Sequence, residues 1–226
     1  MSHTLVQGSG IGALAHLREL HLSGTSVNND RLQEIAALAD LESLSLDYTD
    51  VTDEGLAALA GLGKLTRLNL AGSDVGDAGL ENLASLKSLR SLSLSYGRFT
   101  AAGLQYLEGL ENLNELDLIR TRTTDAGLES IGKLRHLRRL NLDYTNFGDA
   151  GLAHLKDLAE LEELRMDSAA VTDRSLDVLR SLRSLKLLNL YHTLVTEAGY
   201  QSLKASLPGC RIVWDRDSGL PGRRGS

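Results

Sequence analysis

Two aspartates, Asp143 and Asp167, are the residues whose type and spacing best suggest chemistry. Each follows a short alternation of polar and apolar residues, and they lie 24 residues apart. If the alternations are neighbouring strands of one sheet, the two side chains lie about 5 Å apart. Carboxylates at that separation can serve glycoside hydrolysis or bind calcium. The plainer interpretation is a solvated acidic patch balanced by Arg139 and Arg165, because an open sheet offers little of the pocket that catalysis needs.

Other familiar chemical motifs are missing from the sequence. There is no glycine-rich loop ending in Lys-Ser or Lys-Thr, no GxSxG and no CxxC. His21 and His192 would lie about seven strands, or roughly 34 Å, apart, too far to share a metal. Cys210, the single cysteine, has no nearby partner that would activate it. We therefore predict a protein that is not an enzyme and that has no cofactor and no metal.

The two aspartates belong to a repeat of 24 residues that runs along almost the whole chain. Leucine or isoleucine recurs at Leu20, Leu44, Leu68, Leu92, Leu116, Leu140, Leu164, Leu188 and Ile212. Two residues after each of these lies another apolar residue, from Leu22 and Leu46 to Met166 and Trp214. The register holds over nine units, which predicts nine short strands with alternate side chains exposed.

One unit, residues 41–64, shows how each repeat folds. Residues 43–47 alternate as a half-buried strand, and residues 48–50 turn the chain. Thr52 is a good N-cap, and an apolar stripe of helical spacing follows at Leu56, Leu59 and Leu62. A short strand and a short helix bury their apolar faces only when units stack. The sequence thus predicts an α/β solenoid that curves with the parallel sheet on the inside, because helices are wider than strands.

The capping position gives an internal check. Its occupants all favour helix N-caps: Asn28, Thr52, Gly76, Thr100, Thr124, Gly148, Thr172 and Thr196. The next position is mostly acidic, which suits a helix N-terminus. Glycine recurs two residues later and indicates close packing between units, at Gly55, Gly79, Gly103, Gly127, Gly151 and Gly199. Arg31 and Ser175 break that rule, so we expect looser packing there.

The pattern LxxLxLxxTxVTDxGLxxLxxL resembles the leucine-rich-repeat family, over Ile11 to about Trp214. It is most similar to the repeats of F-box leucine-rich-repeat proteins and of related bacterial proteins. The resemblance implies a right-handed solenoid, or horseshoe, with a concave parallel sheet of about nine strands and short helices on the convex side. The chain shows no F-box segment, so a ubiquitin-ligase adaptor role is not implied. In the cysteine-containing branch of the family a Cys ends the strand turn, where this chain mostly has Thr or Ser; Gly97 and Ala169 cannot supply a hydroxyl and mark two weak positions.

The ends and the bulk properties set further expectations. We expect a tail at residues 1–10, a repeat domain at 11–215 closed by Trp214, and a disordered tail at 216–226. The net charge of -6 argues against nucleic acid, and no apolar run is long enough to span a membrane. One cysteine and no recognisable signal peptide favour a cytoplasmic protein.

Tyrosine and arginine on the predicted sheet face and its loop edge point to binding, since both types are enriched at interface hot spots. The C-terminal half of that face is richer in aromatic, apolar and charged groups, so we predict a protein partner centred on the fifth to eighth strands. The alternatives are a ligand- or calcium-binding protein using Asp143 and Asp167, with hydrolysis the weaker option, and a self-associating structural rod. The protein itself is expected to be a monomer or a weak homodimer. The predicted partner-binding residues are Tyr48, Tyr96, Asp117, Ile119, Arg120, Asp143, Tyr144, Arg165, Asp167, Leu187, Tyr191 and His192.

Overall fold

A computed structural model describes residues 16–217 of the chain. The predicted N-terminal tail, positions 11–15 of the predicted repeat domain, and positions 218–226 of the predicted C-terminal tail lie outside the described residues. Within the described part, no helix combines the length and the apolar character needed to cross a membrane.

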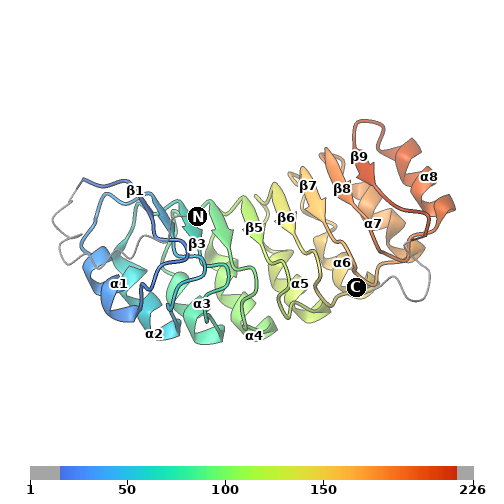
Figure 1. Cartoon of the computed structure of the whole chain (residues 1–226). Coiled ribbons are helices and arrows are strands. Elements are labelled where there is room, and N and C mark those ends of the chain that lie inside the picture. The colour runs from blue at the N-terminus through green and yellow to red at the C-terminus, as the bar shows by residue number, and fades with distance from the viewer. Residues whose placement is uncertain (1–15, 218–226) are drawn as a thin grey trace.

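Nine parallel strands form one sheet in which each strand pairs with the next along the chain. Equivalent residues face each other across every pair, as Leu20 does with Leu44 and Leu188 with Ile212, so the 24-residue register of the sequence is the register of the sheet. Figure 1 shows the strands side by side along the inner side of a curved rod. The strands are β1 Glu19–His21, β2 Ser43–Ser45, β3 Arg67–Asn69, β4 Ser91–Ser93, β5 Glu115–Asp117, β6 Arg139–Asn141, β7 Glu163–Arg165, β8 Leu187–Asn189 and β9 Arg211–Val213.

Short helices return the chain along the outer side of the rod (Figure 1). All the described α-helices but α7 begin directly after the predicted capping position, and in the unit of α7 a 3-10 segment does so. In four units the side chain of Asn28, Thr100, Thr172 or Thr196 accepts a hydrogen bond from the first turn. The α-helices are α1 Asn29–Ile35, α2 Asp53–Leu56, α3 Asp77–Leu83, α4 Ala101–Leu104, α5 Asp125–Ile131, α6 Asp149–Leu152, α7 Leu176–Ser181 and α8 Glu197–Ser206. Short 3-10 segments extend or precede some of them, at Ala57–Gly61, Gln105–Gly109, Ala153–Leu155 and Asp173–Ser175.

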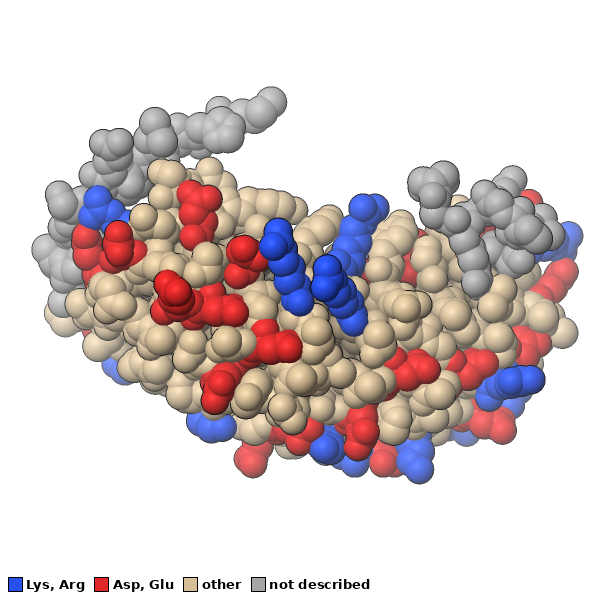
Figure 2. All heavy atoms as spheres, turned by 90° about the horizontal axis from the view of Figure 1, so that it is seen from below, with Lys and Arg blue, Asp and Glu red and all other residues tan. Residues whose placement is uncertain are grey.

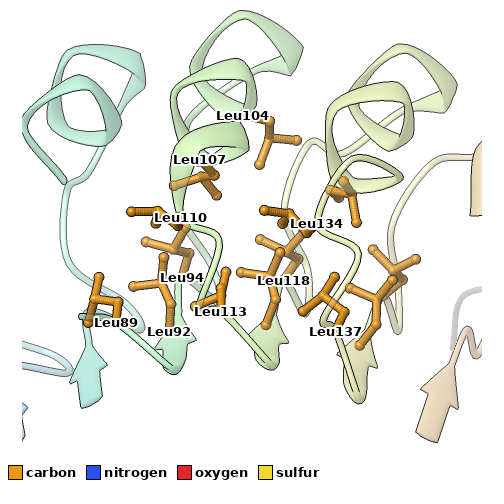
Figure 3. Packing of buried hydrophobic residues seen from close by; sticks show 14 of the residues in the cluster. Leu89, Leu92, Leu94, Leu104, Leu107, Leu110, Leu113, Leu118, Leu134 and Leu137 are labelled. Atoms are coloured by element: carbon orange, nitrogen blue, oxygen red, sulfur yellow. The ribbon is translucent and has the colours of Figure 1, made fainter. Parts of the chain in front are cut away.

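The core is a stack of leucine layers, one from each unit. Leu92 and Leu94 of the β4 unit meet Leu104, Leu107 and Leu110 from the helical side of the same unit (Figure 3), and each is at most 1% exposed. The next unit supplies the same layer again, so most leucines have neighbours on both sides. This continuity explains why the register never slips: a shifted unit would place polar residues in the core.

The acidic residues at the helix starts link neighbouring units. In five units the carboxylate oxygen Oδ1 accepts a hydrogen bond from the backbone N–H of the next unit's N-cap residue, at 2.7–2.9 Å: Asp53 from Gly76, Asp77 from Thr100, Asp125 from Gly148, Asp149 from Thr172 and Asp173 from Thr196. The recurrent glycines leave room for these carboxylates, because a Cβ at Gly79 or Gly151 would collide with Asp53 or Asp125.

Of the two departures from the glycine rule, Arg31 pairs with Glu34 of its own helix, and at Ser175 the expectation of loose packing is wrong. Ser175 is 2% exposed, and its hydroxyl donates to Asp149 at 2.5 Å, so this contact between units is close and polar.

Ala101 stands where most other units have an acid at the helix start. No side chain of the described residues accepts a hydrogen bond from the Thr124 backbone N–H. The interruption therefore lies between the units of β4 and β5, where a Cβ at Gly127 would meet the side chain of Leu104 rather than an acid.

The strand turns and the C-terminal end follow the sequence. Turn hydroxyls donate to backbone carbonyls, as Thr49 does to Leu46 and Thr145 to Leu142. At Gly97, predicted to be a weak position, the ring of buried Phe99 occupies the space that a side chain would need. Trp214 stacks on Tyr200 with ring centroids 4.8 Å apart and packs against the last leucine layer, confirming its role as a cap.

Candidate functional site

A row of left-handed turns follows the strands on the concave side of the rod. We call it the turn row. Its residues have φ between 53° and 69° and recur every 24 residues: Gly24, Tyr48, Gly72, Tyr96, Arg120, Tyr144, Ser168 and His192. Only glycine adopts this conformation without penalty, and other residues pay about 1 kcal/mol or more. Six of the eight positions nevertheless carry a side chain, which points to a use for these side chains outside the core.

Tyr48 and Tyr96 form an aromatic pair at the N-terminal end of the turn row. Their ring centroids lie 6.3 Å apart although a whole unit separates them in sequence. Tyr48 leans over the intervening turn, where a Cβ on Gly72 would overlap its ring. The rings remain 60% and 46% exposed, so their contact with each other leaves most of the aromatic surface in water.

The turn row alternates between ring-bearing turns and turns without rings. Tyr48, Tyr96, Tyr144 and His192 recur every 48 residues, and the residues between them are Gly24, Gly72, Arg120 and Ser168. The Tyr48–Gly72 contact supplies a steric reason for the first of these pairs, because the Tyr48 ring leans over the next turn, whereas the turns after Tyr96 and Tyr144 hold the side chains of Arg120 and Ser168. The 48-residue spacing of Tyr48, Tyr96 and Tyr144 is visible in the sequence and is the signal that predicts this alternation.

The C-terminal part of the turn row is more tightly connected. The guanidinium of Arg120 lies 4.9 Å from the ring centroid of Tyr144, close enough for a cation–π contact. Tyr191 and His192 have ring centroids 4.0 Å apart, and His192 Nδ1 lies 3.0 Å from Asp167 Oδ1. Five of the predicted residues, on the four neighbouring units of β5 to β8, are thus joined into two contacting groups.

Asp143 and Asp167 lie together as predicted, but the structure uses them to connect units. Asp143 Oδ1 accepts a hydrogen bond of 2.6 Å from the backbone N–H of Asp167. Asp167 is 8% exposed, and its Oδ1 accepts a 2.8 Å bond from Ser168. Burial raises the pKa of Asp143, and the negative charge of Asp167 adds to this rise. The charge of Asp167 also raises the pKa of Tyr144.

The predicted counter-ions of this pair are engaged elsewhere. Arg139 pairs with Glu115, and Arg165 pairs with Glu163 at 2.5 Å. Arg165 still lowers the pKa of Asp143 through its charge, but it makes no ion pair with that carboxylate. Within residues 16–217 no group of three or more His, Cys, Asp or Glu side chains is arranged to hold a metal ion.

The remaining predicted residues lie on the sheet beside the turn row. Asp117 and Arg165 line a hollow of about 250 Å³ on the concave face over β4–β7, whose floor includes Leu116 and Leu140. The small serines of β4 border the hollow at one side. Ile119 and Leu187 are half-buried on the same face but are not part of its lining. The hollow is shallow and open, a shape that suits a protruding side chain better than a reaction.

Charge is scattered on the outer surface. On the face in Figure 2, acidic side chains outnumber basic ones, and the basic side chains form no broad patch. A duplex-binding surface needs such a patch. This face therefore gives no support to a nucleic-acid function, in keeping with the net charge of -6.

Comparison with known proteins places this architecture among repeat proteins. A family model described as a leucine-rich repeat region matches residues 2–145, which is more than half of the chain. None of the curated proteins matches the sequence.

Solved structures agree with the family match. An internalin (inlF) from Listeria monocytogenes is similar over 91% of this chain, with a TM-score of 0.75 and 24% identity. An internalin C2 (inlC2) from the same organism is similar over 87% of this chain and 80% of its own length, with a TM-score of 0.72 and 26% identity. A plant peptide hormone receptor, RGFR1, in complex with RGF2, matches 91% of this chain and 33% of its own, with a TM-score of 0.59 and 16% identity. The chain spans 57% of the first internalin.

Proposed function

Because the chain belongs to the leucine-rich-repeat family, we propose that it is an interaction module that holds a partner protein against its concave face, centred on β5–β8 and the adjoining part of the turn row. The single observation that carries this proposal is the set of exposed tyrosines held in left-handed turns. Glycine would fit those turns better, and leucine already fills the core, so folding alone does not require tyrosine there.

The size and composition of the face support the proposal. Nine strands about 4.8 Å apart give a sheet roughly 40 Å long, enough for an interface of standard size. Tyr144 and Tyr191, which are 47% and 37% exposed, are of the type that dominates binding energy at interfaces. A similar fold holds RGF2 in the plant peptide hormone receptor structure, which shows that such a scaffold can present a ligand-binding surface.

Affinity capture from extract of the source organism tests the proposal. The bait is the full chain, compared with a Tyr144→Ala/Tyr191→Ala variant and with a Tyr144→Phe/Tyr191→Phe control that keeps both rings. We expect one or more proteins to be retained by the wild type and the control and lost from the alanine variant. Melting temperatures should agree closely, because exposed side chains contribute within about 0.5 kcal/mol. Identical captured proteins for all three baits would overturn the proposal.

A further inference from the structure

Two arginines flank a buried threonine in the turn that follows β5. Arg120 and Arg122 are exposed, whereas Thr121 between them is 6% exposed and its hydroxyl donates to the carbonyl of Leu118 at 2.8 Å. Because the middle residue points into the core, both guanidinium groups extend into solvent from the same side of the turn. Arg120 belongs to the turn row and Arg122 lies directly beside it.

The hydrogen-bond donors of these two arginines are unused. The guanidinium of Arg120 lies over the ring of Tyr144, and this contact occupies the face of the group while leaving the N–H donors at its edge free to bond. Within residues 16–217, no side chain or carbonyl accepts a hydrogen bond from the guanidinium of Arg120 or Arg122, and neither arginine forms an ion pair. The Tyr144 ring thus orients Arg120 without consuming the donors that an anion would need.

The neighbouring units show what this turn lacks. In the preceding unit Arg98 occupies the position equivalent to Arg122, and its Nε lies 3.2 Å from Oδ1 of Asp74. In the following unit the same position holds Asn146, which carries no charge. Arg98 therefore has its acid within the solenoid, whereas Arg122 has none on either side. Carboxylates from another molecule complement this turn, since the planar guanidinium bonds a carboxylate through two parallel N–H groups.

We propose that the partner protein docks two acidic side chains on Arg120 and Arg122, from an extended segment in which the two acids are two residues apart. Alternate side chains of an extended chain point the same way about 6.6 Å apart, so such a segment repeats the sequence separation of the two arginines. Each carboxylate accepts N–H bonds from one guanidinium. This inference rests on the proposed function, specifies the chemistry of the partner, and adds Arg122 to the binding surface.

Fluorescence anisotropy with labelled synthetic peptides and the full chain tests the proposal. The probe is (Glu-Thr)4, which places every glutamate on one side when it is extended, and (Gln-Thr)4 is its neutral counterpart. The net charge of -6 repels an acidic peptide, so binding of the probe cannot come from the overall charge of the chain. We expect (Glu-Thr)4 to bind at least about tenfold more tightly than (Gln-Thr)4.

Variants locate the binding. Arg120→Gln and Arg122→Gln should each weaken the (Glu-Thr)4 complex about tenfold. Arg90→Gln, the same loss of charge at an exposed arginine that precedes β4 at the opposite edge of the sheet, should not. Arg120→Lys keeps the charge but loses the paired donors, so it should also weaken the complex several-fold. Melting temperatures of all four variants should stay close to that of the wild type, because the side chains are exposed.

Three results would overturn the inference. The first is equal affinity for (Glu-Thr)4 and (Gln-Thr)4, and the second is wild-type affinity for (Glu-Thr)4 in both Arg120→Gln and Arg122→Gln. The third is binding of (phosphoserine-Thr)4 without binding of (Glu-Thr)4, because the turn would then take phosphate rather than carboxylate side chains. If the probe fails while tyrosine-dependent capture from extract succeeds, the concave-face function stands and only the proposed partner chemistry is wrong.

Discussion

Asp47 and Asp143 occupy equivalent positions in repeats that lie four units apart along the rod. Their side chains nevertheless have different surroundings. In the N-terminal half of the concave face, Asp47 Oδ1 accepts hydrogen bonds from Ser23 at 2.5 Å, Ser45 at 2.6 Å and Asn69 at 3.1 Å. In the C-terminal half, Asp143 receives a backbone N–H and faces a second carboxylate. A position in the repeat therefore does not fix the chemistry of a side chain; the neighbouring units do.

The two halves consequently present different surfaces to a partner. The small hydroxyl-bearing side chains of the N-terminal half satisfy their acid within the sheet. The C-terminal half brings Asp143 and Asp167 together, with His192 Nδ1 3.0 Å from Asp167, and places exposed rings beside them.

The largest effect is expected from removing one charge in each half. Asp47→Asn should lower the stability to urea by about 2 kcal/mol, because three donors lose a charged acceptor. Asp143→Asn should cost much less or raise stability, because it removes repulsion with Asp167. Urea denaturation followed by circular dichroism measures both changes. Equal losses of unfolding free energy in the two variants would contradict the difference between the halves.

A smaller effect is expected at the junction of the halves, where Ala101 interrupts the acceptors that join one helix start to the next. Ala101→Asp should raise stability by about 1 kcal/mol, because it supplies a carboxylate for the Thr124 N–H once the Leu104 methyl beside Gly127 shifts to admit it. Asp77→Ala, which removes the acceptor of Thr100 in the preceding unit, serves as the mirror-image control and should cost a similar amount. An unchanged melting temperature for Ala101→Asp would show that the missing hydrogen bond does not weaken this junction.

The smallest effect is expected from pH. The pKa of Asp143 is raised, so its ionised form weakens the fold at neutral pH, and this penalty disappears as pH falls toward that pKa. Wild type should therefore gain stability relative to Asp143→Asn between pH 7 and pH 4.

Asp149 should give the opposite trend. Burial opposes its ionisation, but hydrogen bonds from Ser175 and Thr172 outweigh burial and lower its pKa, so its contribution is present above pH 4 and is lost below. Wild type should therefore lose stability relative to Asp149→Asn on acidification. If acidification changed the stability of the wild type relative to Asp143→Asn and to Asp149→Asn in the same direction, the opposite pKa shifts of the two aspartates would be contradicted.

Much of the fold could be predicted, because each apolar position repeats nine times and a shifted register would bury charge. The helix caps and the cap at Trp214 followed from residue types for the same reason. The left-handed turns could not be predicted, because Tyr48 and Tyr144 are not turn formers and only backbone geometry reveals their φ. The hydrogen-bond partners of the acids at the helix starts could not be predicted either. Their position suggests that each acid stabilises its own helix, whereas Asp53 accepts a hydrogen bond from the N–H of Gly76 in the next unit.

The contact between Tyr48 and Gly72 has a consequence for how such a chain changes length over generations. Removal of the unit that carries Gly72 would place Tyr48 directly beside Tyr96, where the Tyr48 ring would meet a side chain in place of glycine. Removal of the Tyr48 unit together with the Gly72 unit would keep the alternation of ring-bearing and ring-free turns. Loss of this pair of units therefore preserves the pattern of the surface, whereas loss of the Gly72 unit alone disturbs it.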